Sequence, residues 1–149
     1  MTQARSRSRS AARLAAVQAL YQHEMEGTPV PRLLKEFHDH RLGALIEDEQ
    51  YHDAERDFFD DIVVGADARR DEIDALIGAR LAEGWSLERL DRAMRAILRA
   101  GAYELIARPD VPVGSVISEY VDVAHAFYDK RESGFVNGLL DAIAKEARR

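Results

Sequence analysis

Four arginines near the N-terminus have the side-chain chemistry and the spacing to bind phosphate. They are Arg5, Arg7, Arg9 and Arg13. A guanidinium group can donate two parallel hydrogen bonds to one anion, and it also stacks on the exposed bases of single-stranded RNA. No acidic residue precedes Glu24 to neutralise these arginines within the sequence. On composition alone, an RNA-binding arm and a frayed, solubilising tail are equally good interpretations.

The spacing of these arginines predicts how a helix would display them. On a helix that begins near Arg5, the side chains of Arg5, Arg9 and Arg13 lie on one face, because they recur every four residues. The Arg7 side chain lies on a different face of this helix, near the position of Gln18 further along. The serines that alternate with the arginines lower the helix propensity, so the first turns are expected to become ordered on binding.

The distribution of charge favours a local contact with an anion. The chain has 149 residues and a net charge of −6. Residues 1–23 carry +4, whereas the rest of the chain has 17 basic and 27 acidic residues and carries −10. An acidic body with a basic N-terminal segment is typical of a protein that touches phosphate at one place.

Metal-dependent chemistry has little support in this sequence. Helical di-iron enzymes use Glu-x-x-His pairs on two helices and one further glutamate from each of two others. Glu49 with His52 has that spacing, and so does Asp122 with His125, although Asp122 departs from the glutamate of the pattern. The absence of cysteine excludes disulfides, thiolate zinc sites and cysteine nucleophiles. We expect solvated histidines without metal or cofactor, and a di-iron enzyme stays open as an alternative.

Other catalytic signatures are also missing from the sequence. It contains neither a nucleophile elbow nor a phosphate-binding P-loop. Acids and bases recur at i, i+4 in the pairs Glu88–Arg92 and Asp91–Arg95, which predict a self-neutralised, solvated helix face. No uncharged apolar run approaches the roughly 20 residues that cross a bilayer. We therefore expect a cytoplasmic protein that is not an enzyme and has no membrane contact.

Helical periodicity recurs along the chain and strand-like alternation does not, which predicts an all-α fold of about seven helices. The expected helices span about 5–26 and 31–42, two segments between 58 and 81 joined near 65–70, about 87–108 after an N-cap at Ser86, and one each after Pro112 and Gly134. One buried stripe runs from Leu87 to Leu105, and Gly101 within it predicts the close approach of Phe127 or Leu139. Phe127 and Phe135 are expected in the core.

Four blocks of the sequence resemble the NusB family of bacterial transcription antitermination factors. The blocks are 13–21 (RLAAVQALY), 96–105 (AILRAGAYEL), 110–112 (DVP) followed by 117–119 (ISE), and 135–141 (FVNGLLD). They occur in the family's order and span nearly the whole chain. The resemblance implies a single domain, residues 1–149, made of two three-helix halves that share a core. It also implies that residues 1–10 form a basic, flexible arm.

The resemblance implies partners and a binding site as well. The family binds boxA-containing single-stranded RNA together with the small-subunit ribosomal protein NusE, within a complex of other Nus factors and RNA polymerase. The implied RNA site comprises Arg5, Arg7, Arg9, Arg13, Gln18 and Tyr21. Family members commonly carry a basic or histidine-containing stretch before Phe135, where this chain has Glu132-Ser-Gly134, which weakens an RNA contact there. A second alternative is the NusB-like module that precedes the catalytic domain of certain ribosomal RNA methyltransferases.

Overall fold

The computed structural model describes residues 3–41 and 53–148, and within these segments all regular secondary structure is helical. The elements are α1 (Gln3–Glu26), α2 (Val30–Glu36), the π-helical turn η1 (Phe37–Arg41), α4 (Asp53–Ala68), α5 (Arg70–Gly78), the 3-10 turn η2 (Leu87–Arg89), α6 (Arg92–Ala107), α7 (Val113–Phe127) and α8 (Lys130–Ala147). The predicted all-α fold is confirmed. No helix in these segments is long and apolar enough to cross a membrane.

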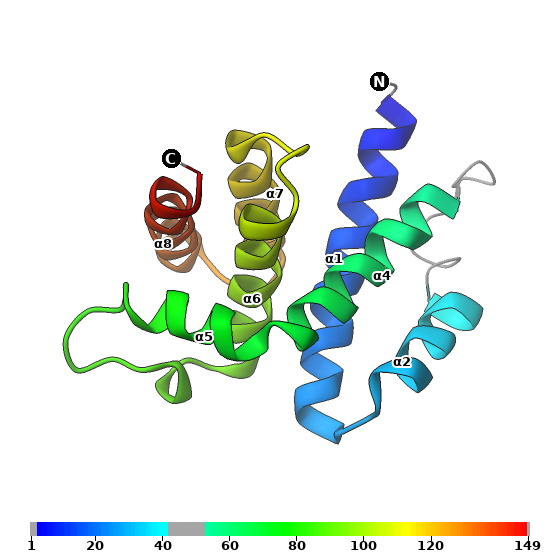
Figure 1. Ribbon diagram of the computed structural model, residues 1–149, viewed down its shortest axis with the longest axis horizontal. Coiled ribbons are helices and arrows are strands. Elements are labelled where there is room, and N and C mark those ends of the chain that lie inside the picture. Colours follow the sequence, from blue (N-terminus) through cyan, green and yellow to red (C-terminus); the bar gives the residue numbers. More distant parts are fainter. Residues whose placement is uncertain (1–2, 42–52, 149) are drawn as a thin grey trace.

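The helices form two groups that meet along α6 (Figure 1). Helices α1, α2 and α4 make up the N-terminal group, and α6, α7 and α8 make up the C-terminal group, with α5 connecting them. Helix α6 packs against α1 and α4 on one side and against α7 and α8 on the other. Its central residues, including Ile97 and Leu98, are completely buried. The core is therefore shared between the halves, as the resemblance implied.

Gly101 allows α6 to approach its neighbours closely. A Cβ atom added there would lie 2.9 Å from Leu140 Cδ1 and 3.4 Å from Tyr120 Cδ2. The predicted close approach is confirmed, but the neighbours are Leu140 of α8 and Tyr120 of α7. The sequence prediction of Phe127 or Leu139 at this contact is wrong.

The start of α6 differs from the prediction. The expected helix from Leu87 is only a 3-10 turn, and Ser86 makes no capping hydrogen bond through its side chain. Asp91 caps the helix instead, because its carboxylate accepts a hydrogen bond of 2.9 Å from the backbone N–H of Met94. A carboxylate at this position also interacts favourably with the helix dipole, which a serine does not. Leu87 and Leu90 therefore precede the helix.

Helix α8 also starts earlier than predicted. Asp129 is its N-cap and accepts a hydrogen bond from the backbone N–H of Arg131, so Gly134 lies inside the helix. The register places Val136 and Leu139 in the core but leaves Phe135 37% exposed. Phe127, at the end of α7, is 44% exposed. The predictions that these two phenylalanines are buried are wrong.

Candidate nucleic-acid interface

Three of the six residues predicted to bind RNA share one face of α1. Arg7 is exposed, Gln18 is half-buried, and Tyr21 is 40% exposed. Gln18 lies eleven residues after Arg7 and Tyr21 three residues after Gln18, spacings that place all three side chains on the same side of a helix. We call this surface the Arg7 face. It presents a cation, an amide and an aromatic ring in line along the helix.

The Arg7 face continues into a groove beside the C-terminal half of α1. The groove has a volume of about 470 Å³ and is lined by Val17, Gln18, Tyr21, Gln22, Met25, Glu26, Ala93 and Phe127. Tyr21 and Phe127 are both partly exposed, and they come from helices at opposite ends of the chain. Exposed aromatic rings of this kind can stack on unpaired bases. Sequence reasoning missed Phe127 because its position on α7 follows the periodicity of a core residue.

Arg9 occupies a different environment from Arg7. Its side chain is half-buried, and its guanidinium carbon lies 4.6 Å from the centre of the Phe58 ring on α4. The guanidinium groups of Arg13 and Arg108 each lie 4.9 Å from the same ring. Cation–π contacts of this kind stabilise the packing of α1 on α4. The backbone of Arg5 belongs to α1, but its side chain lies outside the described residues.

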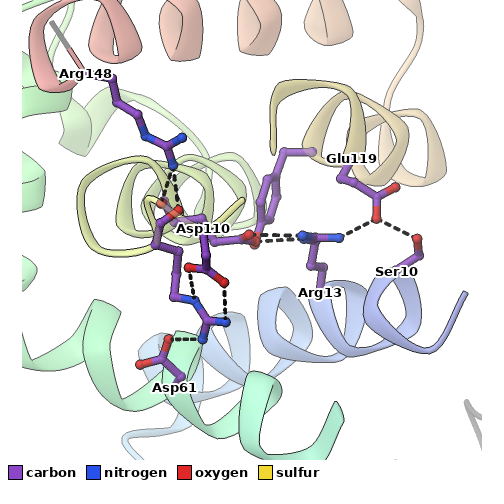
Figure 2. A network of polar contacts seen from close by, with 9 residues as sticks. Ser10, Arg13, Asp61, Asp110, Glu119 and Arg148 are labelled. Atoms are coloured by element: carbon purple, nitrogen blue, oxygen red, sulfur yellow. Dashed lines mark hydrogen bonds and ion pairs between the residues drawn. The ribbon is translucent and has the colours of Figure 1, made fainter. Parts of the chain in front are cut away.

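Arg13 is part of the core. Only 4% of the residue is exposed. Its Nε and Nη2 atoms donate hydrogen bonds of 2.8 and 3.1 Å to the two carboxylate oxygens of Glu104. Its Nη1 atom donates a bond of 2.6 Å to Glu119 (Figure 2). The interpretation of Arg13 as an arginine without acidic partners is therefore wrong, since both carboxylates come from distant helices.

The carboxylates around Arg13 are held by further hydrogen bonds. Glu104 is completely buried on α6 and also accepts a bond of 2.5 Å from the Tyr120 hydroxyl on α7. Glu119 accepts a second bond, of 2.5 Å, from the Ser10 hydroxyl on α1. Burial lowers the pKa of Arg13, but the hydrogen bonds and charge of Glu104 outweigh it, so the pKa is raised. Arg13 remains a cation and is neutralised inside the molecule.

A second polar network fixes the turn between α6 and α7. Arg108 donates hydrogen bonds to Asp61 on α4, at 3.0 Å, and to Asp110 in the turn, at 3.1 Å. Arg148 donates from Nη2 to the carbonyl oxygens of Arg108, at 2.8 Å, and of Glu104, at 3.2 Å (Figure 2). Its Nη1 atom donates to the carbonyl oxygen of Val111, at 2.6 Å. These contacts tie the end of α8 to the turn that precedes α7. They fix the turn after which α7, the helix that carries Glu119, begins.

The arginines of α6 serve the fold rather than a nucleic-acid surface. Arg95 forms an ion pair of 2.8 Å with Glu24 of α1, and its Nη1 atom donates a 2.6 Å bond to the Leu90 carbonyl. Arg99 forms two hydrogen bonds, of 2.8 and 3.0 Å, with Asp74 of α5. Both arginines are neutralised, but their side chains are only 13% and 11% exposed, so the predicted solvated face is wrong. The predicted pairings of Asp91 with Arg95 and of Glu88 with Arg92 are both wrong, because the helix starts only at Arg92. The partner of Arg95 lies on another helix, and Arg92 donates to the Met25 sulfur.

The candidate metal ligands do not form a site in the described part of the chain. Within residues 3–41 and 53–148, no group of three or more histidine and acidic side chains could hold a metal ion. Asp122 and His125 are both exposed on α7, and the His125 ring lies 3.1 Å from the Ser133 hydroxyl. Glu49 and His52 lie outside the described residues.

Comparison with known proteins gives a consistent result. The model of the NusB family matches residues 10–145. The transcription antitermination protein NusB of Sphingopyxis alaskensis is 72% identical over 145 residues, which is 97% of each chain. That of Novosphingobium aromaticivorans is 68% identical over 148 residues, which is 99% of this chain and 100% of that protein.

Solved structures agree with the sequence comparison. The structure of T. maritima NusB has a TM-score of 0.74 and 33% identity, and the match covers 95% of this chain and 93% of that one. A chain from the complex of the antitermination factors NusB and NusE with double-stranded RNA has a TM-score of 0.75 and 29% identity, covering 94% of this chain and 98% of that one. The similarity therefore extends over nearly the whole length of the relatives. The protein belongs to the NusB family.

Proposed function

We propose that this protein is a transcription antitermination factor that binds boxA-containing single-stranded RNA together with the ribosomal protein NusE. The observation that carries this proposal is the Arg7 face, where an exposed guanidinium, an amide and an aromatic ring lead into an open groove. These groups suit a phosphate, a base edge and a base plane respectively. This combination supports a function in binding single-stranded RNA.

The similarity to a NusB–NusE–RNA complex supports the same proposal. Partners of this protein would be the RNA, NusE, and the other Nus factors and RNA polymerase of an antitermination complex. The direct RNA site would comprise Arg7, Gln18 and Tyr21. Arg5 and Arg9 stay candidates from the sequence, although Arg9 also packs on Phe58. Arg13 is left out because its donors are occupied by Glu104 and Glu119.

The test is a titration of labelled boxA RNA, with a scrambled single strand and a duplex as competitors, in the presence and absence of NusE. We expect Tyr21→Ala to weaken boxA binding, because base stacking contributes about 1–3 kcal/mol per base. Arg7→Ala should weaken it as well, because a phosphate contact is lost. The matched control is Arg32→Ala, which removes an equal charge from the exposed surface of α2. Equal losses in Arg7→Ala and Arg32→Ala would show that net charge, and not the Arg7 face, determines binding.

A further inference from the structure

We propose that Glu119 is a positioning residue that orders the RNA-binding part of α1, and this proposal rests on the proposed function. Its Oε1 atom accepts hydrogen bonds from both Ser10 Oγ, at 2.5 Å, and Arg13 Nη1, at 2.6 Å. The two donors are 109 and 106 residues away in the sequence. One oxygen atom of α7 thus holds two successive turns of α1 (Figure 2).

Glu104 and Glu119 fix different parts of α1. Glu104 binds Nε and Nη2 of Arg13 and is completely buried, so it anchors that residue to the core. Glu119 reaches one turn further towards the N-terminus through Ser10. Ser10 is three residues from Arg7, and a contact at Ser10 therefore fixes the turn that displays Arg7. The proposed role of Glu119 is to extend the fixed part of α1 to the RNA contact.

The sequence of this part of α1 explains why it needs such a contact. Serine is a weaker helix former than alanine, and serines alternate with arginines from Arg5 to Ser10. Ser8 is buried and Arg9 packs on Phe58 of α4, so these turns have other contacts with the fold, but the hydrogen bond to Glu119 ties them to α7. Without that hydrogen bond they would fray more readily, and RNA would have to order them on binding. Ordering one flexible side chain weakens affinity by about two- to tenfold.

A purely electrostatic role for Glu119 predicts the opposite result. A carboxylate near a phosphate-binding surface repels RNA, so its removal should tighten binding. A hydrogen-bonding role predicts that removal weakens binding even though a negative charge is lost. The signs of the two effects differ, which allows a pair of variants to separate them.

The experiment compares Glu119→Ala with Glu119→Gln. Both variants lose the same charge, but glutamine keeps a carbonyl oxygen that can accept from Ser10 and Arg13. We expect the alanine variant to bind boxA RNA about three- to tenfold more weakly than the glutamine variant. Ser10→Ala, which changes no charge, should reproduce part of this loss. Asp122→Asn, on the exposed surface of the same helix, serves as the charge control.

Amide hydrogen exchange of the free protein provides the second readout. Protection at residues 8–12 should fall in Glu119→Ala and be retained in Glu119→Gln, while α6 keeps its protection in both. Equal RNA affinity of the two variants, whether tighter than wild type or unchanged, would overturn the positioning role. Unchanged protection in Glu119→Ala would overturn it too, even if wild type failed to bind RNA. Failure of the folded wild-type protein to bind boxA RNA with NusE present would refute the proposed function itself.

Discussion

Replacement of Glu104 by glutamine removes a charge at the junction of the two halves and keeps the shape of the side chain. Glu104 accepts two hydrogen bonds from Arg13 and one from Tyr120, and it is completely buried. In the variant, an amide nitrogen replaces one of the two carboxylate oxygens, so its N–H donors face the N–H donors of Arg13. Arg13 then keeps only Glu119 as an acidic partner. Removal of one member of a buried ion pair costs about 3–5 kcal/mol. Because Glu119 remains, we expect a loss of about 3 kcal/mol in the free energy of unfolding, near the lower limit of that range.

Urea unfolding of a double-mutant cycle would measure this contribution. A loss of about 3 kcal/mol should lower Tm by about 6–12 °C in a chain of this size. Arg13→Met on its own strands the buried Glu104 charge, whereas the double variant removes both charges of that pair and keeps the Tyr120 hydrogen bond. The partly exposed Glu119 loses Arg13 in both and keeps Ser10. The two substitutions should therefore be less than additive, with a coupling energy of about 1–3 kcal/mol. A loss below about 1 kcal/mol for Glu104→Gln, or strict additivity, would refute the buried pairing.

Four further predictions concern the arm, the salt dependence, the core and the pH dependence. Deletion of residues 1–7 should leave cooperative unfolding intact, because the deletion ends before the buried Ser8, and it should weaken RNA binding. Circular dichroism and a binding titration on one sample check the two expectations. If Arg5, Arg7 and Arg9 each contact one phosphate, log K for boxA RNA without NusE should fall with log salt at a slope of about −2, and a slope steeper than about −3 would require basic residues outside the arm. Leu98→Ala should lower the free energy of unfolding, measured in urea, by about 2–5 kcal/mol, because Leu98 is completely buried in α6. A change under about 0.5 kcal/mol, as at an exposed site, would contradict this packing. Burial and the hydrogen bond to Asp61 raise the pKa of Tyr103 to about 12. The folded state therefore keeps a proton that the unfolded state loses near pH 10. The free energy of unfolding should fall as the pH rises from about 10 to 12. Tyr103→Phe should reduce that slope, and parallel slopes for variant and wild type would contradict the assignment.

The helices were predictable from the sequence because their signals are local. Apolar spacing and the glycine after α1 are enough to define that helix, and the Gly27 backbone has the positive φ of +71° expected at such an end. The starts of α6 and α8 were not predictable with the same accuracy. In each case two possible start signals lie within a few residues. For α6 the sequence favoured Ser86, but Asp91 is the N-cap. For α8 it favoured a start after Gly134, but Asp129 is the N-cap. Local propensity cannot decide between them, since the choice depends on how each helix packs.

The partners of Arg13 could not be read from local sequence. Glu104 and Glu119 are 91 and 106 residues away, and only the packing of α6 and α7 against α1 brings them together. One signal was nevertheless present. Glu104 lies within the apolar block at residues 96–105, on a helix with a clear buried stripe. A carboxylate at such a position needs a buried cation, and Arg13, in the apolar block of α1, was a candidate for that cation.

Some of the N-terminal arginines stabilise the fold, and others are proposed to bind RNA. Arg13 is neutralised by two carboxylates and Arg9 packs on Phe58, so the charge available to RNA is smaller than the +4 of the segment. The rest of the chain carries −10, but this repulsion is screened beyond about 8 Å at physiological salt. In the proposed site, a few cations on one helix would hold phosphates locally, while stacking of bases on Tyr21 and Phe127 in the groove would supply affinity that depends less on salt. The remaining positive surface must come from a partner, which is the physical reason to expect NusE to strengthen RNA binding.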